Sequence, residues 1–220
     1  MRKILLAAHH LGLRDYITLE VADTSDPSDS LREQNPTGGI PVLVKQDGSS
    51  VYDSRVIMDF LDFEKPIVEL ERKIEELKIK LPEAKPPVGS YVATKITGNL
   101  LFISGQISIA ENGDLIKGKI GKDLSTEQGY DAAKRCGLSI VSQAKVACDG
   151  DLSKIKSCIK LTGYVNSTDN YTDQPKVING ASDLIASIFG DAGMHTRAAV
   201  STNSLPLGVS VEVDAIFELN

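Results

Sequence analysis

Three closely spaced prolines, Pro82, Pro86 and Pro87, constrain how this chain of 220 residues can fold. Proline cannot donate a backbone hydrogen bond, and it biases the residue before it toward extended backbone. Neither a helix nor a central strand is therefore expected to continue through this segment, and we place a domain boundary there. The sequence predicts three parts: a segment over 1–63, a linker helix over 64–85 and a larger domain over 86–220.

A helix pattern precedes the prolines. Apolar residues recur at alternating spacings of three and four, at Ile67, Leu70, Ile74, Leu77 and Leu81. This pattern predicts a helix with one narrow apolar stripe, although about two heptads are too few to establish a coiled coil. Two interpretations stay open: the helix packs on a neighbouring domain, or it mediates oligomerisation.

Predicted strands and helices alternate after the prolines. They are a strand over 100–104, a helix from Ser125 onward, a strand over 156–165, a helix over 175–189 and two strands on either side of Leu205-Pro206. Ser125 is expected to cap the first helix, because its hydroxyl can accept from N–H groups of the first turn. In the last strand, apolar residues alternate with Ser210, Glu212 and Asp214, which is typical of one buried face. We expect a compact α+β domain with both helices on one face of the sheet.

Composition and charge exclude several kinds of partner. The net charge is -6 at pH 7 and no dense basic run occurs, so the electrostatic footprint of a nucleic-acid-binding protein is missing. Cys136, Cys148 and Cys158 form neither a disulfide framework nor a CxxC ligand pair, which fits a reduced compartment. No apolar run approaches the roughly 18 residues that span a bilayer. We expect a cytoplasmic protein with no membrane and no nucleic-acid partner.

Two charged residues of the larger domain are candidates for chemistry. Glu212 could act as a base, and Arg197 could bind an acid substrate through two parallel N–H bonds. Spacing alone leaves open a solvated ion pair between neighbouring strands. His195 is open to a structural role or to proton transfer, and no second histidine or cysteine stands at metal-ligand spacing. Gly180, inside a helix pattern, indicates a packing or close-approach constraint.

A longer set of residues carries a family resemblance. The segment Gly98-Asn-Leu-Leu-Phe-Ile-Ser-Gly-Gln106 resembles the strand by which RidA/YjgF proteins, also called endoribonuclease L-PSP-like, are known. Further matches occur in the family's order along 86–220: Tyr91, Val165-Asn166 with Asn179, Arg197, Leu205-Pro206 and Glu212.

The resemblance implies a chorismate-mutase-like α+β fold that trimerises, with ligand clefts between subunits. In deaminase members the arginine binds the substrate carboxylate and the glutamate positions or activates water, so Arg197 and Glu212 inherit these catalytic roles. Tyr91, Ser104, Gly105 and Asn179 would line the cleft. The implied reaction is hydrolytic deamination of an imine or enamine acid, such as 2-iminopropanoate or 2-aminoacrylate, to a keto acid and ammonia. No metal or organic cofactor is implied.

Two features of the sequence bear on this functional expectation. Ala199 stands two residues after the arginine, where deaminase members often carry cysteine, so pocket shape and substrate choice are in question. The phrases Val177-Ile-Asn-Gly-Ala-Ser-Asp-Leu184 and Gly193-Met-His-Thr-Arg197 look like a branch of the family that is usually uncharacterised. The alternative is a non-catalytic trimer that binds keto acids or related metabolites, and glutathione binding or ribonuclease activity comes third.

The first segment carries a second resemblance. Asn35-Pro-Thr-Gly-Gly-Ile-Pro-Val-Leu43 and Asp53-Ser54 are similar to the amino-terminal, thioredoxin-like domain of glutathione transferases. The resemblance implies a cis peptide at Ile40-Pro41 and a γ-glutamyl contact at Asp53-Ser54. Asp47-Gly48, between two short predicted strands, indicates a hairpin. Because Arg2 corresponds to a point inside the first helix of such a domain, we expect an incomplete thioredoxin-like α/β segment that begins after the residue that would activate a thiol, which disfavours glutathione conjugation.

Overall fold

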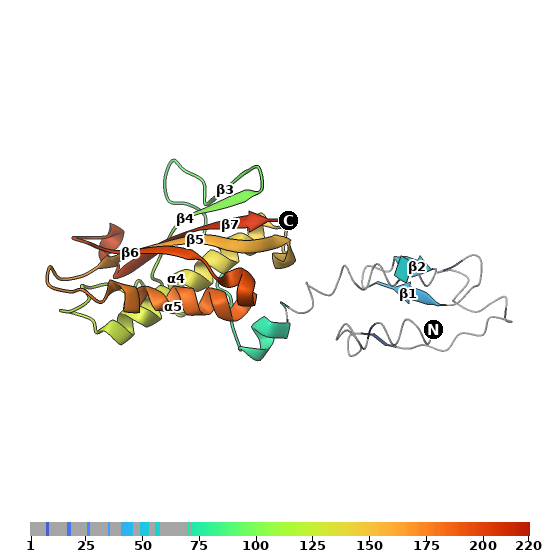
Figure 1. Cartoon of the computed structure of the whole chain (residues 1–220), viewed down its shortest axis with the longest axis horizontal. Helices are drawn as coiled ribbons and strands as arrows, with labels where there is room; N and C mark the ends of the chain where they lie inside the picture. The colour runs from blue at the N-terminus through green and yellow to red at the C-terminus, as the bar shows by residue number, and fades with distance from the viewer. Residues whose placement is uncertain are drawn as a thin grey trace. The chain divides into compact units, whose positions relative to one another are not determined.

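The described residues of this computed structural model are 8, 17–18, 26, 35, 41–45, 49–52, 56–57, 70 and 72–220. The chain divides into two compact units, Met1–Glu71 and Arg72–Asn220, and Figure 1 shows both. Within the described part of the chain, no helix has the length and apolar character that crossing a membrane requires.

The second unit is built on one five-stranded sheet. Its strands are β3 (Thr94–Thr97), β4 (Leu100–Ile107), β5 (Ile155–Asn166), β6 (Thr196–Thr202) and β7 (Val211–Leu219). They lie in the order β3-β4-β7-β5-β6, with β5 and β6 parallel and the other neighbouring pairs antiparallel. β4 runs past Ser104, its predicted end, because its pairing with β7 resumes after a bulge. The parallel pair needs a crossover connection, which α5 (Gln174–Phe189) supplies.

The two long helices cover the same face of this sheet. Figure 1 shows α4 (Thr126–Ala147) and α5 side by side below the strands. The apolar residues of β7 point into this layer as their alternation predicts, and Val211, Val213, Ala215 and Phe217 are each at most 1% exposed. Three short 3-10 helices complete the unit: η2 (Leu152–Lys154), η3 (Gly190–Gly193) and η4 (Pro206–Gly208). The predicted α+β arrangement with one covered sheet face is confirmed.

The predicted cap of α4 is confirmed, whereas one prediction for the last strand is wrong. Ser125 Oγ accepts from the N–H of Gln128, and the Gln128 side chain accepts from the N–H of Ser125. The helix therefore begins with a capping box, which satisfies two N–H groups that the helix itself leaves unpaired. Ser210 was predicted on the polar face, but it is fully buried just before β7, where its hydroxyl lies 3.3 Å from that of Ser108.

The linker helix is shorter than its apolar pattern predicts. The pattern continues to Leu81, but the described helical residues end at Glu76. Lys78 adopts left-handed backbone with φ 51°, and the N–H of Ile79 donates to the carbonyl of Ile74 at 2.9 Å. This is the Schellman arrangement that closes many helices. Glycine usually occupies the left-handed position, so the lysine gave no sequence signal for the stop.

Gly180 is explained by the contact between the two long helices. A Cβ at this position would overlap the backbone carbonyl oxygen of Tyr130 and approach the backbone nitrogen of Lys134 to 3.0 Å. Both neighbours belong to the α4 backbone and cannot rotate away. The packing constraint indicated by a glycine inside a helix is therefore a close approach of α5 to α4.

Gly180→Ala is expected to destabilise the protein, although alanine is the better helix former. Helix propensity favours alanine by about 1 kcal/mol, but forcing apart two packed helices costs about 1–3 kcal/mol or more. Thermal unfolding of the full chain would measure the difference, with Ser187→Ala on the exposed side of α5 as the control. An unchanged or raised Tm for Gly180→Ala would show that the close approach is not constraining.

The described residues of the first unit include one small sheet. β1 (Val42–Val44) and β2 (Ser50–Tyr52) pair antiparallel, as the Asp47-Gly48 signal between them predicts. Ala8 and Ile57 are buried, with Ile17, Leu43 and Val51 packed against them. Ile40, Asp53 and Ser54, implied by the resemblance to glutathione transferases, lie outside the described residues.

Candidate functional site

Two side chains of α5 hold Arg197 at the edge of the sheet. Arg197 lies on β6 and pairs with Leu161 of β5, which is fully buried on the helix-covered face. Paired residues of neighbouring strands share a face, so Arg197 is on the helix side of the sheet. Its Nη1 donates to Oδ1 of Asn179 at 2.8 Å and to Oγ of Ser182 at 3.0 Å. We call Asn179, Ser182 and Arg197 the arginine group.

The arginine group keeps several N–H donors available. Over residues 72–220, no protein atom accepts from Nε or Nη2 of Arg197, or from Nδ2 of Asn179. The N–H bonds on Nε and Nη2 are parallel, and this fork matches the two oxygens of a carboxylate. Arg197 is exposed, so an acid from solution can reach the fork. Arg197 and Asn179, both predicted to contact the ligand, therefore lie at one place.

Glu212 lies on the other face of the sheet. Its neighbours on β7, Val211 and Val213, are buried beneath the helices, so strand alternation directs Glu212 to the face that α4 and α5 leave open. Burial of the side chain, and then the negative charge of Asp214, raise the pKa of Glu212 above its ordinary value. A carboxylate with a raised pKa is a stronger base when it is ionised, which suits proton abstraction near neutral pH.

Gly105 allows the Glu212 carboxylate to lie against β4. A Cβ at position 105 would overlap Oε1 of Glu212, so a larger residue there would displace this flexible side chain. Ser104 ties the strand to the segment before β3, because its Oγ donates to the carbonyl of Val92 at 2.8 Å. Tyr91 directly precedes that residue and is 51% exposed. We call Tyr91, Ser104, Gly105 and Glu212 the glutamate group.

One chain does not bring the two groups together. β5 stands between β6, which carries Arg197, and β7, which carries Glu212. Neighbouring strands are about 4.8 Å apart, so these backbones are separated by roughly 10 Å across the sheet. The two side chains also point to opposite faces. The predicted site residues therefore form two half-sites, and one small molecule cannot contact both within a single chain.

Sequence reasoning missed two residues that touch these half-sites. Ser182 accepts from Arg197 and lies 3.0 Å from Nε2 of His195. Asp214 raises the pKa of Glu212 and accepts from the hydroxyl of Tyr164 at 3.4 Å. Ser182 stands three residues after Asn179, one helical turn away, and Asp214 stands two residues after Glu212 on the same strand face. These two spacings were the sequence signals that could have identified Ser182 and Asp214.

Other reactive side chains of the second unit do not form a competing site. Burial raises the pKa of the thiols of Cys136, Cys148 and Cys158, in the last case to about 12. All three therefore stay protonated near neutral pH and are poor nucleophiles. Across the described residues, no cluster of three or more His, Cys, Asp or Glu side chains is arranged to hold a metal ion.

Residues 71–219 match the protein family described as "YjgF/chorismate_mutase-like, putative endoribonuclease", and residues 1–63 match the glutathione S-transferase N-terminal domain. Protein TCP17 of Trypanosoma cruzi is 44% identical over 148 residues, which are 67% of this chain and 92% of that protein. A RutC family protein of Pyrococcus horikoshii is 27% identical over 134 residues, or 60% of this chain and 90% of the relative.

A solved structure agrees with these sequence matches. The crystal structure of protein Atu1372, of unknown function, from Agrobacterium tumefaciens has a TM-score of 0.67 and 41% identity to this chain. The similarity covers 74% of this chain and 99% of that one. The match over 71–219 spans more than half of the chain and coincides with the α+β unit that carries both half-sites. The chain therefore belongs to the RidA/YjgF family, with a glutathione-transferase-like segment before its family domain.

Proposed function

We propose that the protein hydrolyses small imine or enamine acids, such as 2-iminopropanoate or 2-aminoacrylate, to a keto acid and ammonia. The observation that carries the proposal is the N–H fork of Arg197 beside the Nδ2 of Asn179, none of which donates to a protein atom within residues 72–220. This donor set fits the carboxylate of a small acid. Glu212, whose pKa is raised by burial and by Asp214, supplies the base that the reaction requires.

The proposed reaction needs little beyond binding, positioning and proton transfer. Arg197 holds the carboxylate, so the imine carbon lies at a fixed distance from the guanidinium. Glu212 accepts a proton from a water molecule. At the same time the water oxygen bonds to the imine carbon, and the C=N π electrons move to nitrogen. Glu212 returns that proton to nitrogen, which gives the aminol. The C–N bond then breaks as the aminol hydroxyl forms the keto C=O bond and its proton passes to nitrogen, so that ammonia is released. The carbon skeleton of the acid is unchanged.

A second copy of the chain is proposed to complete the site. The glutamate group lies on the open face of the sheet, which also carries exposed apolar residues such as Phe102 and Val200, 37% and 45% exposed. If the arginine group of one copy meets the glutamate group of another, both half-sites face one cleft. In a closed ring each interface then has the same composition. We propose a homotrimer, as the family resemblance implies.

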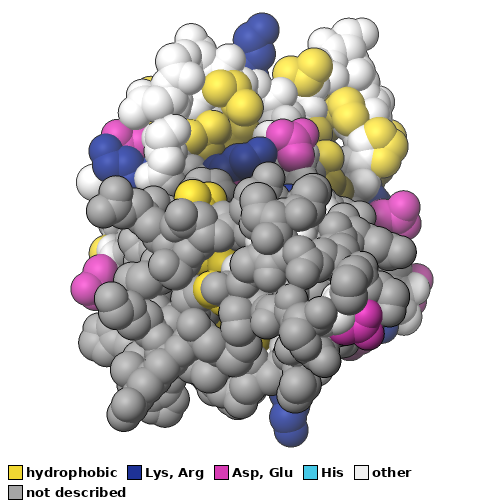
Figure 2. Space-filling model, turned by 90° about the vertical axis from the view of Figure 1, so that its right-hand side faces the viewer, with side chains coloured by type: hydrophobic (Ala, Val, Ile, Leu, Met, Phe, Trp, Pro, Cys, Tyr) yellow, Lys and Arg dark blue, Asp and Glu magenta, His cyan; other side chains and the backbone are white. Residues whose placement is uncertain are grey.

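Charge favours a small acid over an RNA substrate. Glu212, the proposed base, and Asp214 lie together on the open face, and two carboxylates repel a phosphate backbone. Among the described side chains drawn in Figure 2, basic and acidic side chains are interspersed. The non-catalytic alternative, a trimer that binds keto acids, needs only the arginine group and is separated from the hydrolase by measuring turnover.

Trapping of 2-aminoacrylate with semicarbazide tests the proposed function. The acid is generated in place, and its keto product is followed with and without the protein. The expected result is less trapped adduct and faster keto-acid release, both lost in Arg197→Ala and retained in Lys122→Ala, which changes an exposed cation outside the half-sites. Unchanged trapping by a verified oligomer that still binds pyruvate would favour the binding-only alternative.

The pH dependence of turnover is expected to follow Glu212. Because its pKa is raised and the ionised form is the base, kcat/KM is expected to fall on the acid side at a higher pH than an ordinary glutamate gives. Asp214→Asn removes a negative charge that raises this pKa, so the acid limb should move to lower pH. The exposed Asp169→Asn is the control. An acid limb that stays in place or moves upward in Asp214→Asn would contradict the assignment.

A further inference from the structure

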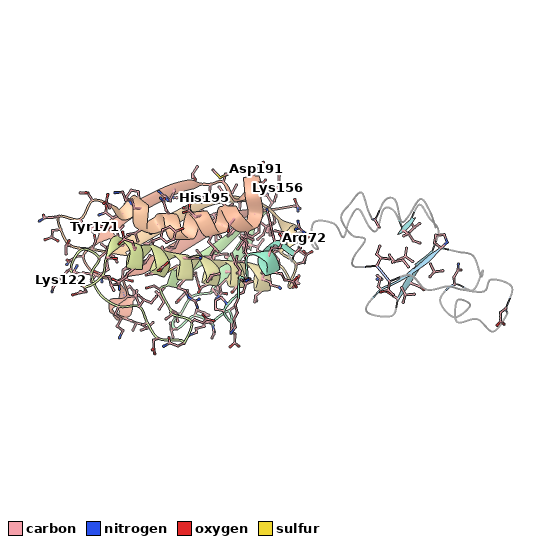
Figure 3. All side chains as sticks on the ribbon, turned by 90° about the horizontal axis from the view of Figure 1, so that it is seen from below. Arg72, Lys122, Lys156, Tyr171, Asp191 and His195 are labelled. Atoms are coloured by element: carbon pink, nitrogen blue, oxygen red, sulfur yellow. The ribbon has the colours of Figure 1, made fainter. Side chains whose placement is uncertain are left out.

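The two sequence phrases typical of this family branch meet in the structure through their polar side chains. The first, over 177–184, contributes Asn179 and Ser182 from α5; the second, over 193–197, contributes His195 and Arg197. Ser182 Oγ lies 3.0 Å from Nη1 of Arg197 and 3.0 Å from Nε2 of His195. Figure 3 shows His195 beside α5, nearer to Asp191 than to Tyr171, which lies at the other end of the unit.

The direction of each hydrogen bond in this cluster follows from its acceptors. Nδ1 of His195 lies 2.7 Å from the carbonyl oxygen of Gly193, which can only accept, so Nδ1 carries a proton. In the neutral imidazole Nε2 is then an acceptor, and the Ser182 hydroxyl donates to it. The lone pairs of that hydroxyl accept from Arg197. A single chain of donation therefore runs from Arg197 through Ser182 and His195 to the Gly193 carbonyl.

Close packing fixes the last acceptor of this chain of hydrogen bonds, the carbonyl of Gly193. A Cβ at Gly193 would approach the Cα of Ala186 to 2.8 Å and also meet the carbonyl oxygen of Ile185. Glycine therefore lets η3 lie directly against the backbone of α5. Because the accepting carbonyl belongs to this packed turn, His195 is oriented by backbone and not by another mobile side chain.

We propose that Ser182 and His195 are positioning residues that orient Arg197 for its ligand. Nη1 carries two hydrogens, and Asn179 and Ser182 accept both. The plane of the guanidinium is then set, and the parallel N–H bonds of Nε and Nη2 are the pair that faces outward. These hydrogen bonds thus select which edge of the guanidinium binds the carboxylate. That ligand assignment rests on the proposed function, whereas the fixed orientation of Arg197 does not.

Ser182→Ala should weaken binding of the acid while changing turnover little. Loss of one indirect support for a charged donor is expected to raise KM, and the Kd for pyruvate, by roughly 5- to 20-fold, with kcat changed by less than about threefold because the base is untouched. Ser182→Thr keeps a hydroxyl and should restore most of the affinity. Ser187→Ala, on the exposed side of the same helix, is the matched control.

His195 is expected to act only through Ser182. His195→Ala should raise KM by roughly 3- to 10-fold, because the serine hydroxyl loses the acceptor that orients it. In the Ser182→Ala background the same replacement should have almost no further effect, which gives a strongly non-additive double-mutant cycle. Additive effects of the two substitutions would contradict the proposal that His195 acts through Ser182.

A readout on Arg197 itself separates this inference from the proposed function. In the full-length protein, the guanidinium NMR signals of Arg197 are assigned by their loss in Arg197→Ala, and rotation about the Cζ–Nη1 bond is measured. Slow rotation in the wild type that becomes fast in Ser182→Ala, but not in Ser187→Ala, is expected. Rotation that stays slow in Ser182→Ala overturns the inference. If rotation changes as expected while the wild type neither binds pyruvate nor consumes 2-aminoacrylate, the proposed function fails and the positioning chain stands.

Discussion

Replacing Glu212 by glutamine is expected to lower kcat for imine hydrolysis by about 10²- to 10⁴-fold, the usual contribution of a general base. Glutamine has nearly the same shape but accepts no proton from water. Binding of pyruvate should change little, because the arginine group is intact. Steady-state keto-acid release and calorimetric binding would measure the two effects separately.

The same substitution is expected to stabilise the fold near neutral pH. The raised pKa means that the folded chain binds the Glu212 proton more tightly than the unfolded chain does, so the free energy of unfolding falls as pH rises through the interval between the ordinary and raised values. Glutamine removes this fall. Glu218→Gln is the matched control on β7, since Glu218 is paired with Lys156 at 2.9 Å.

For turnover, a Glu212→Gln protein with wild-type kcat would contradict the proposed role of Glu212 as the base.

Replacing Arg197 by alanine is expected to have the second large effect, about a 10²- to 10⁴-fold fall in kcat/KM. Two charge-assisted hydrogen bonds to the substrate carboxylate are lost, and each is worth about 1.5–3 kcal/mol. Most of the change should be in KM. Lysine at this position keeps the charge but lacks the parallel N–H fork, so Arg197→Lys should recover only part of the affinity.

Discrimination between acids and amides provides the control for Arg197. The wild type should bind pyruvate much more tightly than its uncharged amide, and Arg197→Ala should bind both weakly and about equally. Lys122→Ala should keep the wild-type preference. If Arg197→Ala still prefers the acid, the guanidinium is not the carboxylate site and the arginine group has another role.

The sequence predicted local structure better than it predicted which residues share a face. The Ser125 cap, the alternation in β7 and the end of α5 at Phe189 are read from neighbouring residues, and the structure confirms each. The separation of Arg197 from Glu212 could not be read in this way. It depends on the insertion of β5 between β6 and β7, which is a property of the sheet order and not of any local pattern.

The same limit explains why the contact between Ser182 and His195 beside Arg197 was not predicted. Ser182 and His195 stand in phrases that already indicated a family branch, but their contact requires η3 to pack against α5. The early stop of the linker helix was missed for a different reason, because Lys78 occupies a left-handed position that glycine normally marks. In both cases tertiary packing or an unusual backbone conformation decided the outcome.

Arg197 of one copy and Glu212 of another are proposed to share one cleft, and complementation between two inactive variants tests this arrangement. Arg197→Ala and Glu212→Gln are co-expressed with different tags, and oligomers that contain both are purified. In a cyclic trimer each mixed oligomer keeps one intact interface, so about one third of wild-type activity should return from two inactive variants. Mixed oligomers no more active than either variant alone would contradict a site shared between two copies.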